Sequence, residues 1–540
     1  GGAALFLYFN GKAVLFSLFQ RKGESMRGAK ILKLLTSKFL VVCLLLLAEL
    51  LFVPAVIFLL VVYVNNGWVD FALLLLVIVL DVVLVVFIIN SEVNAEYKIA
   101  WIVPVLFLPL MGAVCYLLLR KRKIPRRKLR ELALRFPGAE RLYAQDPAAL
   151  GKLAAKGDFA LQCAELIRKR SFLPATDCCA CEYFPSGERY AARMFEVLKQ
   201  AKKFIFLETF IIARGQFWDS LLAILNERAA AGVDVRVIYD DIGSMTRVPT
   251  NYANILEKQG IRCMCFNKFR PVVDVGQNNR THRKITVIDG ETAFTGGLNF
   301  ADEYLNITHP YGHWKDCGVM VKGRAAQSFT AMFLQMWALR KENEDLSRYV
   351  SQSPEGEISC IPFSDTPLGN GTNICEELYL KIIYNAKKYV YITTPYLILD
   401  GEMKRALIAA ADAGVDVRII VPNIPDKRFV FSVTKAFYSQ LIRENGKIGI
   451  YRYTPGFIHA KGIVSDGECC IIGSTNMDFR SWYLHFESNA IFFDKGVSAA
   501  VYEDFLETCK KSERVTKEQI KIGPHRTIWR AILRIFAPLM

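Results

Sequence analysis

Two histidines and two lysines stand in the same spacing at two places along the chain. The segments NNRTHRKITVIDGETAFTGGLN and GFIHAKGIVSDGECCIIGSTN both contain His-x-Lys-x-x-x-x-Asp, formed by His282, Lys284 and Asp289 and by His459, Lys461 and Asp466. Aligned from the histidine to the final asparagine, the copies share eight of eighteen residues. Because the whole chain holds only six histidines, a chance repetition with matching flanks is a poor explanation. The doubled pattern therefore indicates a chemical role.

Imidazole and ammonium groups are what chemistry at an anionic phosphodiester requires. Lysines neutralise the non-bridging oxygens and the charge that builds up in the transition state. One histidine can attack phosphorus and form a phosphohistidine, which divides one displacement into two. A second histidine can protonate the departing alkoxide and then deprotonate an incoming alcohol or water. Since these groups supply the charge and proton handling, we predict no metal and no cofactor.

Further polar residues follow each copy at comparable places. The acids in GHWKDCGVMV and LHFESNAIFF, Asp316 and Glu487, are candidates to hold the imidazole tautomers. We also predict a phosphate pocket lined by side-chain amide, backbone N–H and hydroxyl donors. The residues that would supply them are Asn299, Asn476, Gly296, Gly297, Gly473 and Ser474. Asp289 and Asp466 belong to the catalytic motif, and within it we interpret them as structural residues of an Asp-Gly turn.

The segments that must position these groups are also repeated. AKKFIFLETFII, from Ala201, is echoed by AKKYVYITTPYL, from Ala386, and AGVDVRVIYDD, from Ala231, by AGVDVRIIVPN, from Ala413. Such β-branched and aromatic runs are typical of buried strands. The order strand, helix, strand predicts an α/β fold with a mixed sheet flanked by helices. In a strand, the histidine and lysine of each copy would share one face, and two pseudo-twofold-related halves would bring both pairs to one cleft.

On these residues the doubled motif resembles the phospholipase D superfamily, and the chain from about residue 100 onward resembles the bacterial cardiolipin synthases within it. The narrower resemblance rests on YDDIGS, GGLNFADEY and GHWKD in the first half and on TPYLILD, GSTNMDFRS and LHFES in the second. It implies transfer of a phosphatidyl group between two phosphatidylglycerol molecules, which gives cardiolipin and glycerol. LHFES departs from the more usual Leu-Asn-Phe-Glu by having His485.

Five regions are expected along the chain. They are transmembrane helices within 39–119, a basic juxtamembrane linker over 120–170, phospholipase D-like domains over 171–350 and 351–515, and an amphipathic C-terminal helix over 516–540. In that helix, Arg526, Arg530 and Arg534 recur every four residues among apolar ones. Such a helix suits a membrane surface or a cap on the domain core, and the sequence does not choose between them.

The N-terminal region predicts a bacterial cell-membrane protein. Apolar runs occur at about 39–64, 71–89 and 100–119, each near the roughly 20 residues that a spanning helix needs. Three runs argue for retained, multi-pass helices rather than a cleaved signal peptide. The third run is followed by RKRKIPRRKLR, a cationic cluster typical of the cytoplasmic side and of anionic headgroup binding. We therefore place the catalytic body in the cytoplasm, although the basic residues before the first run conflict with three full spans.

Net charge and cysteine content leave several alternatives open. A net charge of +16 suits nucleic acid or an acidic lipid surface, so a membrane-tethered nucleic-acid phosphodiesterase is one rival. The apolar runs favour lipid, and we expect phosphatidylglycerol and anionic lipids as partners and no nucleic acid. A phospholipid hydrolase or a phosphatidylserine-type synthase would differ only in the acceptor. The sequence leaves a homo-oligomer open. Cys178, Cys179 and Cys181 lie close together, but no fourth zinc ligand is evident near them, so zinc binding is not expected there.

The two histidines are predicted to have different roles. His282 has the richer cationic surroundings, in which Arg280, Arg283 and Lys284 would hold the anionic diester. His459 follows Gly456 and Phe457, a less charged approach that suits neutral glycerol. The superfamily resemblance also leans towards the first histidine as nucleophile. We therefore expect His282 to form the covalent intermediate and His459 to carry the proton.

Overall fold

The computed structural model has two compact units. It describes residues 51, 67–107, 111–119, 130–131, 134, 136–270, 275–340, 344–351, 354, 356–367, 373–521, 523–535 and 537–539. One unit takes in Gly1–Phe87, Pro104–Arg120 and Arg270–Asp274, and the other Ile88–Val103, Lys121–Phe269 and Val275–Met540. Both copies of the His-Lys pair belong to the second unit, here called the catalytic unit.

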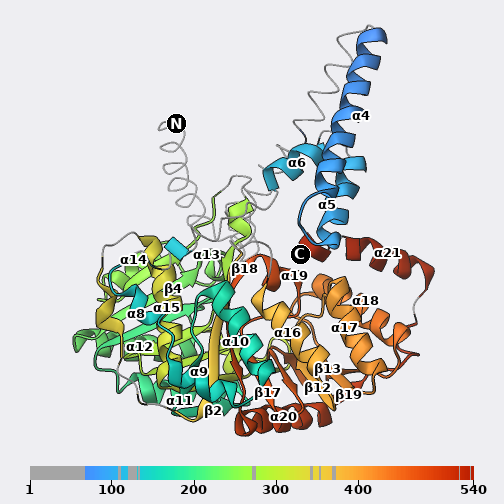
Figure 1. The fold of residues 1–540 in the computed structure, drawn as a ribbon. Coiled ribbons are helices and arrows are strands. Elements are labelled where there is room, and N and C mark those ends of the chain that lie inside the picture. The colour runs from blue at the N-terminus through green and yellow to red at the C-terminus, as the bar shows by residue number, and fades with distance from the viewer. Residues whose placement is uncertain are drawn as a thin grey trace, which may run out of the picture. The chain divides into compact units, whose positions relative to one another are not determined.

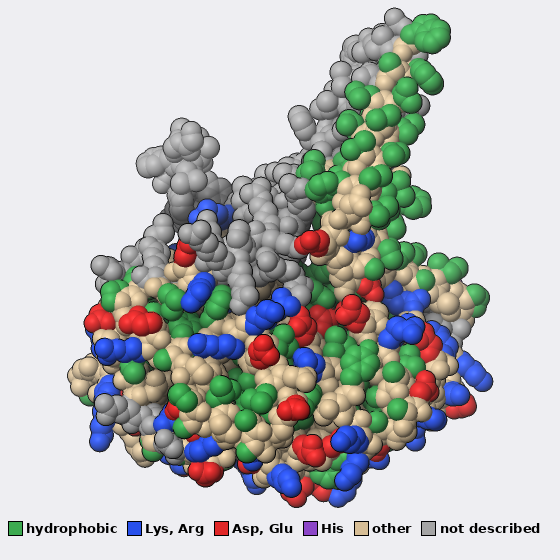
Figure 2. Space-filling view, in the orientation of Figure 1, with side chains coloured by type: hydrophobic (Ala, Val, Ile, Leu, Met, Phe, Trp, Pro, Cys, Tyr) green, Lys and Arg blue, Asp and Glu red, His purple; other side chains and the backbone are tan. Residues whose placement is uncertain are grey.

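The N-terminal helices expose many apolar side chains. They are α4 (Gly67–Ile89), α5 (Ala95–Phe107, with Pro104 inside it) and α6 (Met111–Leu119). Trp68, Phe71 and Val83 on α4 are 83%, 59% and 61% exposed, and Figure 2 shows apolar side chains along this helix. Over the described part of the chain, no helix combines the length and apolarity needed to cross a membrane. The predicted run 39–64, apart from Leu51, and the basic residues 120–129 lie outside the described residues.

The first half of the catalytic unit is a seven-stranded mixed sheet. Its strand order is β2 (Ala180–Phe184), β10 (Gly318–Lys322), β8 (Thr292–Gly296), β7 (Ile285–Ile288), β3 (Phe204–Thr209), β4 (Asp234–Asp240) and β5 (Arg262–Phe266). Strands β3, β4 and β5 are parallel, and the other neighbours are antiparallel. The main helices are α11 (Gly187–Leu198), α12 (Gln216–Ala230) and α15 (Arg324–Trp337).

The second half repeats this order. Its strands are β11 (Ile358–Asp365), β18 (His485–Phe492), β17 (Cys469–Gly473), β16 (Gly462–Ser465), β12 (Tyr389–Thr393), β13 (Asp416–Pro422) and β14 (Gly449–Tyr453), with β1 (Thr176–Cys178) and β19 (Ser512–Arg514) at the edges. Its main helices are α16 (Ile374–Asn385), α17 (Gly401–Asp412), α18 (Arg428–Glu444) and α20 (Lys495–Lys510). The two halves lie side by side (Figure 1), and the predicted α/β fold with a mixed sheet is confirmed.

The halves share a hydrophobic core. Helix α15 belongs to the first half, yet it contacts β1 and β11 of the second sheet as well as β3, β7, β8 and β10. One cluster of buried side chains joins Phe206 and Phe333 of the first half with Ile361 and Phe363 of the second. The remaining helices of the unit are α8 (Ala139–Leu142), α9 (Pro147–Ala154), α10 (Asp158–Ser171), α13 (Asp241–Ser244), α14 (Tyr252–Glu257), α19 (Phe479–Tyr483) and α21 (Pro524–Ile535).

The Asp-Gly turn that ends each motif is tied to the start of a parallel strand of the same half. Asp289 and Asp466 have φ angles of 56° and 55°, in the left-handed region that Asp tolerates better than most residues. The Asp289 carboxylate accepts backbone N–H bonds from Lys202, Lys203 and Phe204 at 2.7–2.9 Å. Asp466 accepts the equivalent bonds from Lys387, Lys388 and Tyr389. These contacts tie each turn to the start of a parallel strand, as the structural interpretation requires.

Candidate active site

Short strand pairs between the halves bring the two motif copies together. β6 (Arg280–Thr281), just before the first histidine, pairs in parallel with the start of β18 in the second half. β15 (Gly456–Ile458), just before the second histidine, pairs in parallel with β9 (His313–Lys315) of the first half. The backbone N–H of His282 donates to Phe486 O at 2.8 Å, and that of His459 to Lys315 O at 2.7 Å. The two crossings are equivalent, as a pseudo-twofold arrangement would make them.

Each histidine is held by a carboxyl group from the other half. His282 Nδ1 lies 2.9 Å from Glu487 Oε1 and 3.0 Å from Oε2. His459 Nδ1 lies 2.7 Å from Asp316 Oδ2. A carboxyl oxygen that accepts the Nδ1–H fixes the tautomer and leaves the Nε2 lone pair available. The sequence identified these two acids as candidates without showing that each would serve the histidine of the other half.

The lysines lie beside the histidines in a site that is nearly closed to solvent. Lys284 Nζ donates to His282 O at 2.7 Å, and Lys461 Nζ donates to His459 O. None of these four residues is more than 7% exposed. His282–Lys284 and His459–Lys461 connect strands rather than lying within one, so the predicted strand is wrong here, although the lysine still turns back towards its histidine.

Burial and the neighbouring cations keep both imidazoles neutral. Burial, followed by the charge of Lys284, lowers the pKa of His282 well below its usual value. Burial and Lys461 lower the pKa of His459 to about 3. The pKa of Lys461 itself falls to about 8, because burial outweighs its carboxylate neighbours. Charge on any of these groups therefore affects the others, as expected for one shared site.

The two carboxyl groups differ in their ionisation. Burial raises the pKa of Glu487 well above its usual range. For Asp316, burial acts in the same direction, but the hydrogen bond and charge of His459 and the charge of Lys461 bring its pKa below the usual value. Asp316 Oδ1 also accepts the Cys317 N–H at 2.9 Å, and Glu487 Oε2 is hydrogen-bonded to the Ser474 hydroxyl. The negative charge is therefore favoured on the partner of His459 and disfavoured on the partner of His282.

The predicted phosphate-pocket donors are mostly engaged within the protein. Asn299 is fully buried, accepts the Ile211 N–H at 3.2 Å and donates to Tyr304 Oη at 2.6 Å. The Gly297 N–H donates to Cys317 O, and a Cβ at Gly297 would come within 2.0 Å of Asp316 Oδ1. Gly297 therefore makes room for the carboxylate. For these residues a direct role at phosphate stays a prediction.

Asn476 and Ser474 show how the second half differs from the first. Asn476 Nδ2 donates to Asp478 at 3.3 Å, and its buried Oδ1 has no hydrogen-bond partner among the described residues. Ser474 occupies the position equivalent to Gly297, and its hydroxyl reaches Glu487. Ser474 therefore supports the carboxyl group that holds His282, and for Asn476 a role at the substrate stays a prediction.

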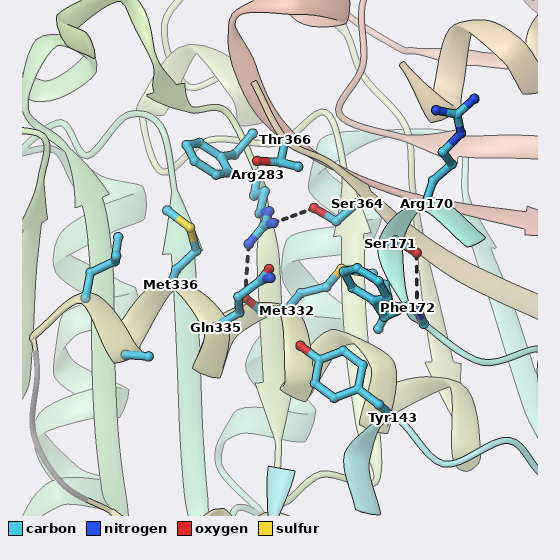
Figure 3. Close-up of a pocket in the computed structure, with 14 residues that line it drawn as sticks. Tyr143, Arg170, Ser171, Phe172, Arg283, Met332, Gln335, Met336, Ser364 and Thr366 are labelled. Atoms are coloured by element: carbon cyan, nitrogen blue, oxygen red, sulfur yellow. Dashed lines mark hydrogen bonds between the residues drawn. The ribbon is translucent and has the colours of Figure 1, made fainter. Parts of the chain in front are cut away.

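Arg283 faces a separate cavity, although it stands between His282 and Lys284. Its guanidinium donates to Met332 O at 3.0 Å and to the Ser364 hydroxyl. Figure 3 shows these bonds and the Tyr143 side chain on the opposite wall of this mainly apolar cavity. The lining contains none of the motif histidines or lysines. The expectation that Arg283 holds the diester is therefore wrong, because consecutive residues of an extended segment point to opposite sides.

Sequence reasoning missed several side chains around the imidazoles. The rings of Tyr304 and Trp314 both lie 5.2 Å from that of His459, and the Phe210 ring lies 5.3 Å from that of His282. Tyr304 belongs to GGLNFADEY and Trp314 to GHWKD, both within the segments that carried the resemblance. His485, which appeared only as a departure from a usual pattern, lies with its ring 5.3 Å from that of His282. Among the described residues, His282, His485 and Glu487 are the one cluster with metal-ligand spacing.

Comparison with known proteins decides the family. The family described as "Cardiolipin synthase, PLD-like domain" matches residues 194–337 and 379–509, one match in each half. The chain belongs to the phospholipase D-like cardiolipin synthase family. A further family, described as "Phospholipase_D-nuclease N-terminal", matches residues 79–121 of this family member.

Individual relatives cover most of the chain. An uncharacterized protein of Streptococcus mutans is 37% identical over 461 residues, 84% of this chain and 99% of that protein. A cardiolipin synthase of Geobacillus thermodenitrificans is 31% identical over 471 residues, 85% of this chain and 92% of the relative. The crystal structure of a phosphatidylserine synthase from Haemophilus influenzae aligns with a TM-score of 0.53 at 14% identity, over 70% of this chain and 98% of that one. The last likeness concerns the fold alone.

Proposed function

We propose that the protein is a cardiolipin synthase that transfers a phosphatidyl group from one phosphatidylglycerol to another and releases glycerol. The observation that carries this proposal is the single site in which two His-Lys pairs meet, each histidine held by a carboxyl group of the opposite half. Membership of the family and the names of its relatives supply the substrate class. Burial of the reacting groups limits the access of water, which favours transfer to an alcohol over hydrolysis.

The reaction divides into two displacements at phosphorus. In the first, His282 Nε2 attacks, a phosphorus–nitrogen bond forms, and the bond to the glycerol headgroup breaks. His459, which takes up a proton when the anionic diester binds beside it and raises its pKa, gives that proton to the departing oxygen. In the second, His459 takes the proton of the acceptor hydroxyl, whose oxygen attacks phosphorus and releases His282. Lys284 and Lys461 balance the charge on the non-bridging oxygens in both steps.

The surroundings of the two imidazoles support this division of roles. A nucleophile has to be neutral, and the pKa of His282 lies well below its usual value because of burial and Lys284. Glu487 Oε1 lies within hydrogen-bond distance of His282 Nδ1, while Oε2 accepts the hydroxyl proton of Ser474, so the carboxyl group fixes the orientation of this ring. A proton carrier has to become an imidazolium in passing, and ionised Asp316 stabilises that charge on His459.

Lipid product analysis tests the proposal. The purified enzyme is incubated with phosphatidylglycerol in liposomes, and the products are identified by mass spectrometry. Cardiolipin and free glycerol in equal amounts are expected. Phosphatidic acid alone would indicate a hydrolase. A lipid product that forms only when serine is added would indicate a phosphatidylserine-type synthase. Cleavage of nucleic acid with the lipid left intact would indicate a nuclease.

We also propose that the N-terminal region attaches the enzyme to the bacterial cell membrane, with several spans and the catalytic unit in the cytoplasm. The support is the apolar sequence runs, the cationic stretch after them, and the exposed apolar side chains of α4. In α21, Ile528 and Trp529 are also 63% and 54% exposed, as a surface-bound helix would have them. Membrane fractions should retain the protein after an alkaline carbonate wash, and labelling of single cysteines from either side of the bilayer should determine the orientation.

A further inference from the structure

His485 is a buried imidazole next to the nucleophile without a partner of its own. It is 6% exposed, and neither ring nitrogen has a hydrogen-bond partner within the part of the chain that the structure describes. Its ring lies 5.3 Å from that of His282, and the planes are inclined by 37°. As the first residue of β18, it is the Cα partner of Arg280 in β6, so the strand pairing that assembles the site also places this ring.

The nearest carboxyl group does not satisfy His485. His485 Nδ1 lies 3.7 Å from Glu487 Oε1, which is too long for a hydrogen bond. Glu487 is already engaged by His282 and by the Ser474 hydroxyl. A buried polar group without a partner destabilises the folded protein, so a bound ligand that accepts from this imidazole would be stabilised by it.

We propose that His485 is a further catalytic residue, which donates a hydrogen bond to a non-bridging oxygen of the phosphodiester while His282 attacks phosphorus. The inference rests on the proposed phosphatidyl transfer and adds a third imidazole to it. With the two rings 5.3 Å apart, the N–H of His485 would donate to an oxygen on the phosphorus that His282 Nε2 attacks. A donor placed there stabilises the charge that develops on these oxygens in the transition state.

The charges around His485 favour an anion. Burial, followed by Arg480, Lys284, Lys427 and Arg280, lowers the pKa of His485 well below its usual value. The ring is therefore neutral and presents one N–H donor and one acceptor. Arg280 is 1% exposed, and its Nη1 lies 3.5 Å from Asp240 Oδ1 and donates to Asn267 O at 2.6 Å, while Nε and Nη2 have no partner among the described residues. Although His485, His282 and Glu487 have metal-ligand spacing, this set of cations opposes a divalent ion and attracts a phosphate.

Two variants of nearly equal shape test the role of the N–H. His485→Asn retains a hydrogen-bond donor, whereas His485→Leu removes it and keeps a similar volume. For His485→Leu we expect kcat/KM with phosphatidylglycerol to fall about 10- to 150-fold, the range for a hydrogen bond to a charged group. His485→Asn should recover most of this loss. His309→Leu, at an exposed position, is the control and should leave the rate unchanged.

Binding of inorganic phosphate, measured by calorimetry, gives a readout that does not depend on the acceptor. Its affinity should fall in His485→Leu and be largely retained in His485→Asn. If the enzyme makes no cardiolipin at all, the transfer proposal fails while this comparison still tests His485. Should His485→Leu not fold, His485→Ala with and without added imidazole supplies the same comparison.

Two results would overturn the inference. Equal kinetics and equal phosphate affinity in the Asn and Leu variants would show that the N–H is not used. A wild-type activity that a chelator abolishes and Zn²⁺ restores, with the restoration absent in His485→Leu, would assign His485 to a metal instead.

Discussion

The carboxyl groups that hold the two histidines have pKa values shifted in opposite directions. Replacing each acid by its amide, in Asp316→Asn and Glu487→Gln, should therefore lower turnover to different extents. In Asp316→Asn, the hydrogen bond to His459 Nδ1 loses an ionised acceptor, since the pKa of Asp316 lies below its usual value because of His459 and Lys461. In Glu487→Gln, a carboxyl group whose pKa burial raises well above its usual range is replaced by a neutral amide. Gln can still accept the Nδ1–H of His282. Its Nε2 can donate to Ser474 Oγ, because this hydroxyl, which donates to Glu487 in the native protein, can turn to Ser488 O.

The size of each effect follows from the kind of hydrogen bond. A bond to a charged group contributes about 1.5–3 kcal/mol, so Asp316→Asn should lower kcat about 10- to 150-fold. The exchange of one neutral acceptor for another changes about 1 kcal/mol or less, so Glu487→Gln should cost no more than about fivefold. Both side chains are fully buried and of unchanged size in the variants, so packing contributes little to the difference.

Steady-state formation of cardiolipin, measured at one pH in one detergent, compares the variants. Thermal unfolding of each protein serves as the control for stability. A loss in Glu487→Gln as large as that in Asp316→Asn would refute the reasoning, because it would mean that both carboxyl groups act as anions. A larger loss in Glu487→Gln would also remove the argument for His459 as the proton carrier.

Four further predictions concern the nucleophile, metals, pH and the membrane. His282→Ala and His459→Ala should both nearly abolish turnover, but with a substrate whose leaving group needs no proton only His459→Ala should accumulate a phosphatidyl-protein adduct, seen by intact mass. Excess chelator should leave turnover unchanged, since two lysines and two histidines supply the charge. The pKa of His459 is about 3 in the folded protein against its usual 6.5, so the unfolded chain binds the proton first as the pH falls. Stability is therefore complete above about pH 7 and should drop by about 2 kcal/mol at pH 5, an effect that His459→Asn removes in pH-dependent melting. Neutral substitutions in the basic stretch should lower activity on anionic bilayers more than in detergent micelles. The residues to be replaced are Arg120, Lys121, Arg122, Lys123, Arg126 and Arg127.

Each of these has a contrary outcome. An adduct on His459 would reverse the histidine roles, and no adduct in either variant would argue against two displacements. Loss of turnover in chelator, with recovery on adding a divalent ion, would give a metal a part in the enzyme. A pH dependence of melting that is the same with and without His459 would show that other groups cause it, and equal activities on bilayers and micelles would remove the electrostatic role of the basic stretch.

Local repetition made much of the fold predictable. The echoed segments around Ala201 and Ala386 become β3 and β12, and both Asp-Gly turns lie where the motif predicted them. Apolar runs and turn residues are local signals of strands and turns. In a duplicated sequence each signal occurs in both halves, so one copy supports the prediction made from the other. The shared location of two histidines and two lysines could be predicted because two similar halves form one site if they pack about a twofold axis.

The strand pairs and the histidine–carboxyl hydrogen bonds between the two halves could not be predicted from the sequence. The pairing of β6 with β18 joins segments about two hundred residues apart, and no local pattern encodes which acid meets which histidine. Arg283 was misplaced because its neighbours in sequence are catalytic while its own side chain points to another cavity. Asn299 was expected at phosphate, yet its amide is engaged by Ile211 and Tyr304, contacts that depend on tertiary packing.

The exchange of carboxyl groups between the halves also bears on how such a protein could have arisen. A single ancestral unit would hold its histidine without an acid and would need a second copy to complete each imidazole pair, so activity would have required a dimer of identical chains. Fusion of the two copies made the partnership permanent and freed each acid to change alone. The present chain has an aspartate facing one histidine and a glutamate facing the other. Duplication thus gave two equal imidazoles, and later divergence of their acids is what made a division of labour between them available.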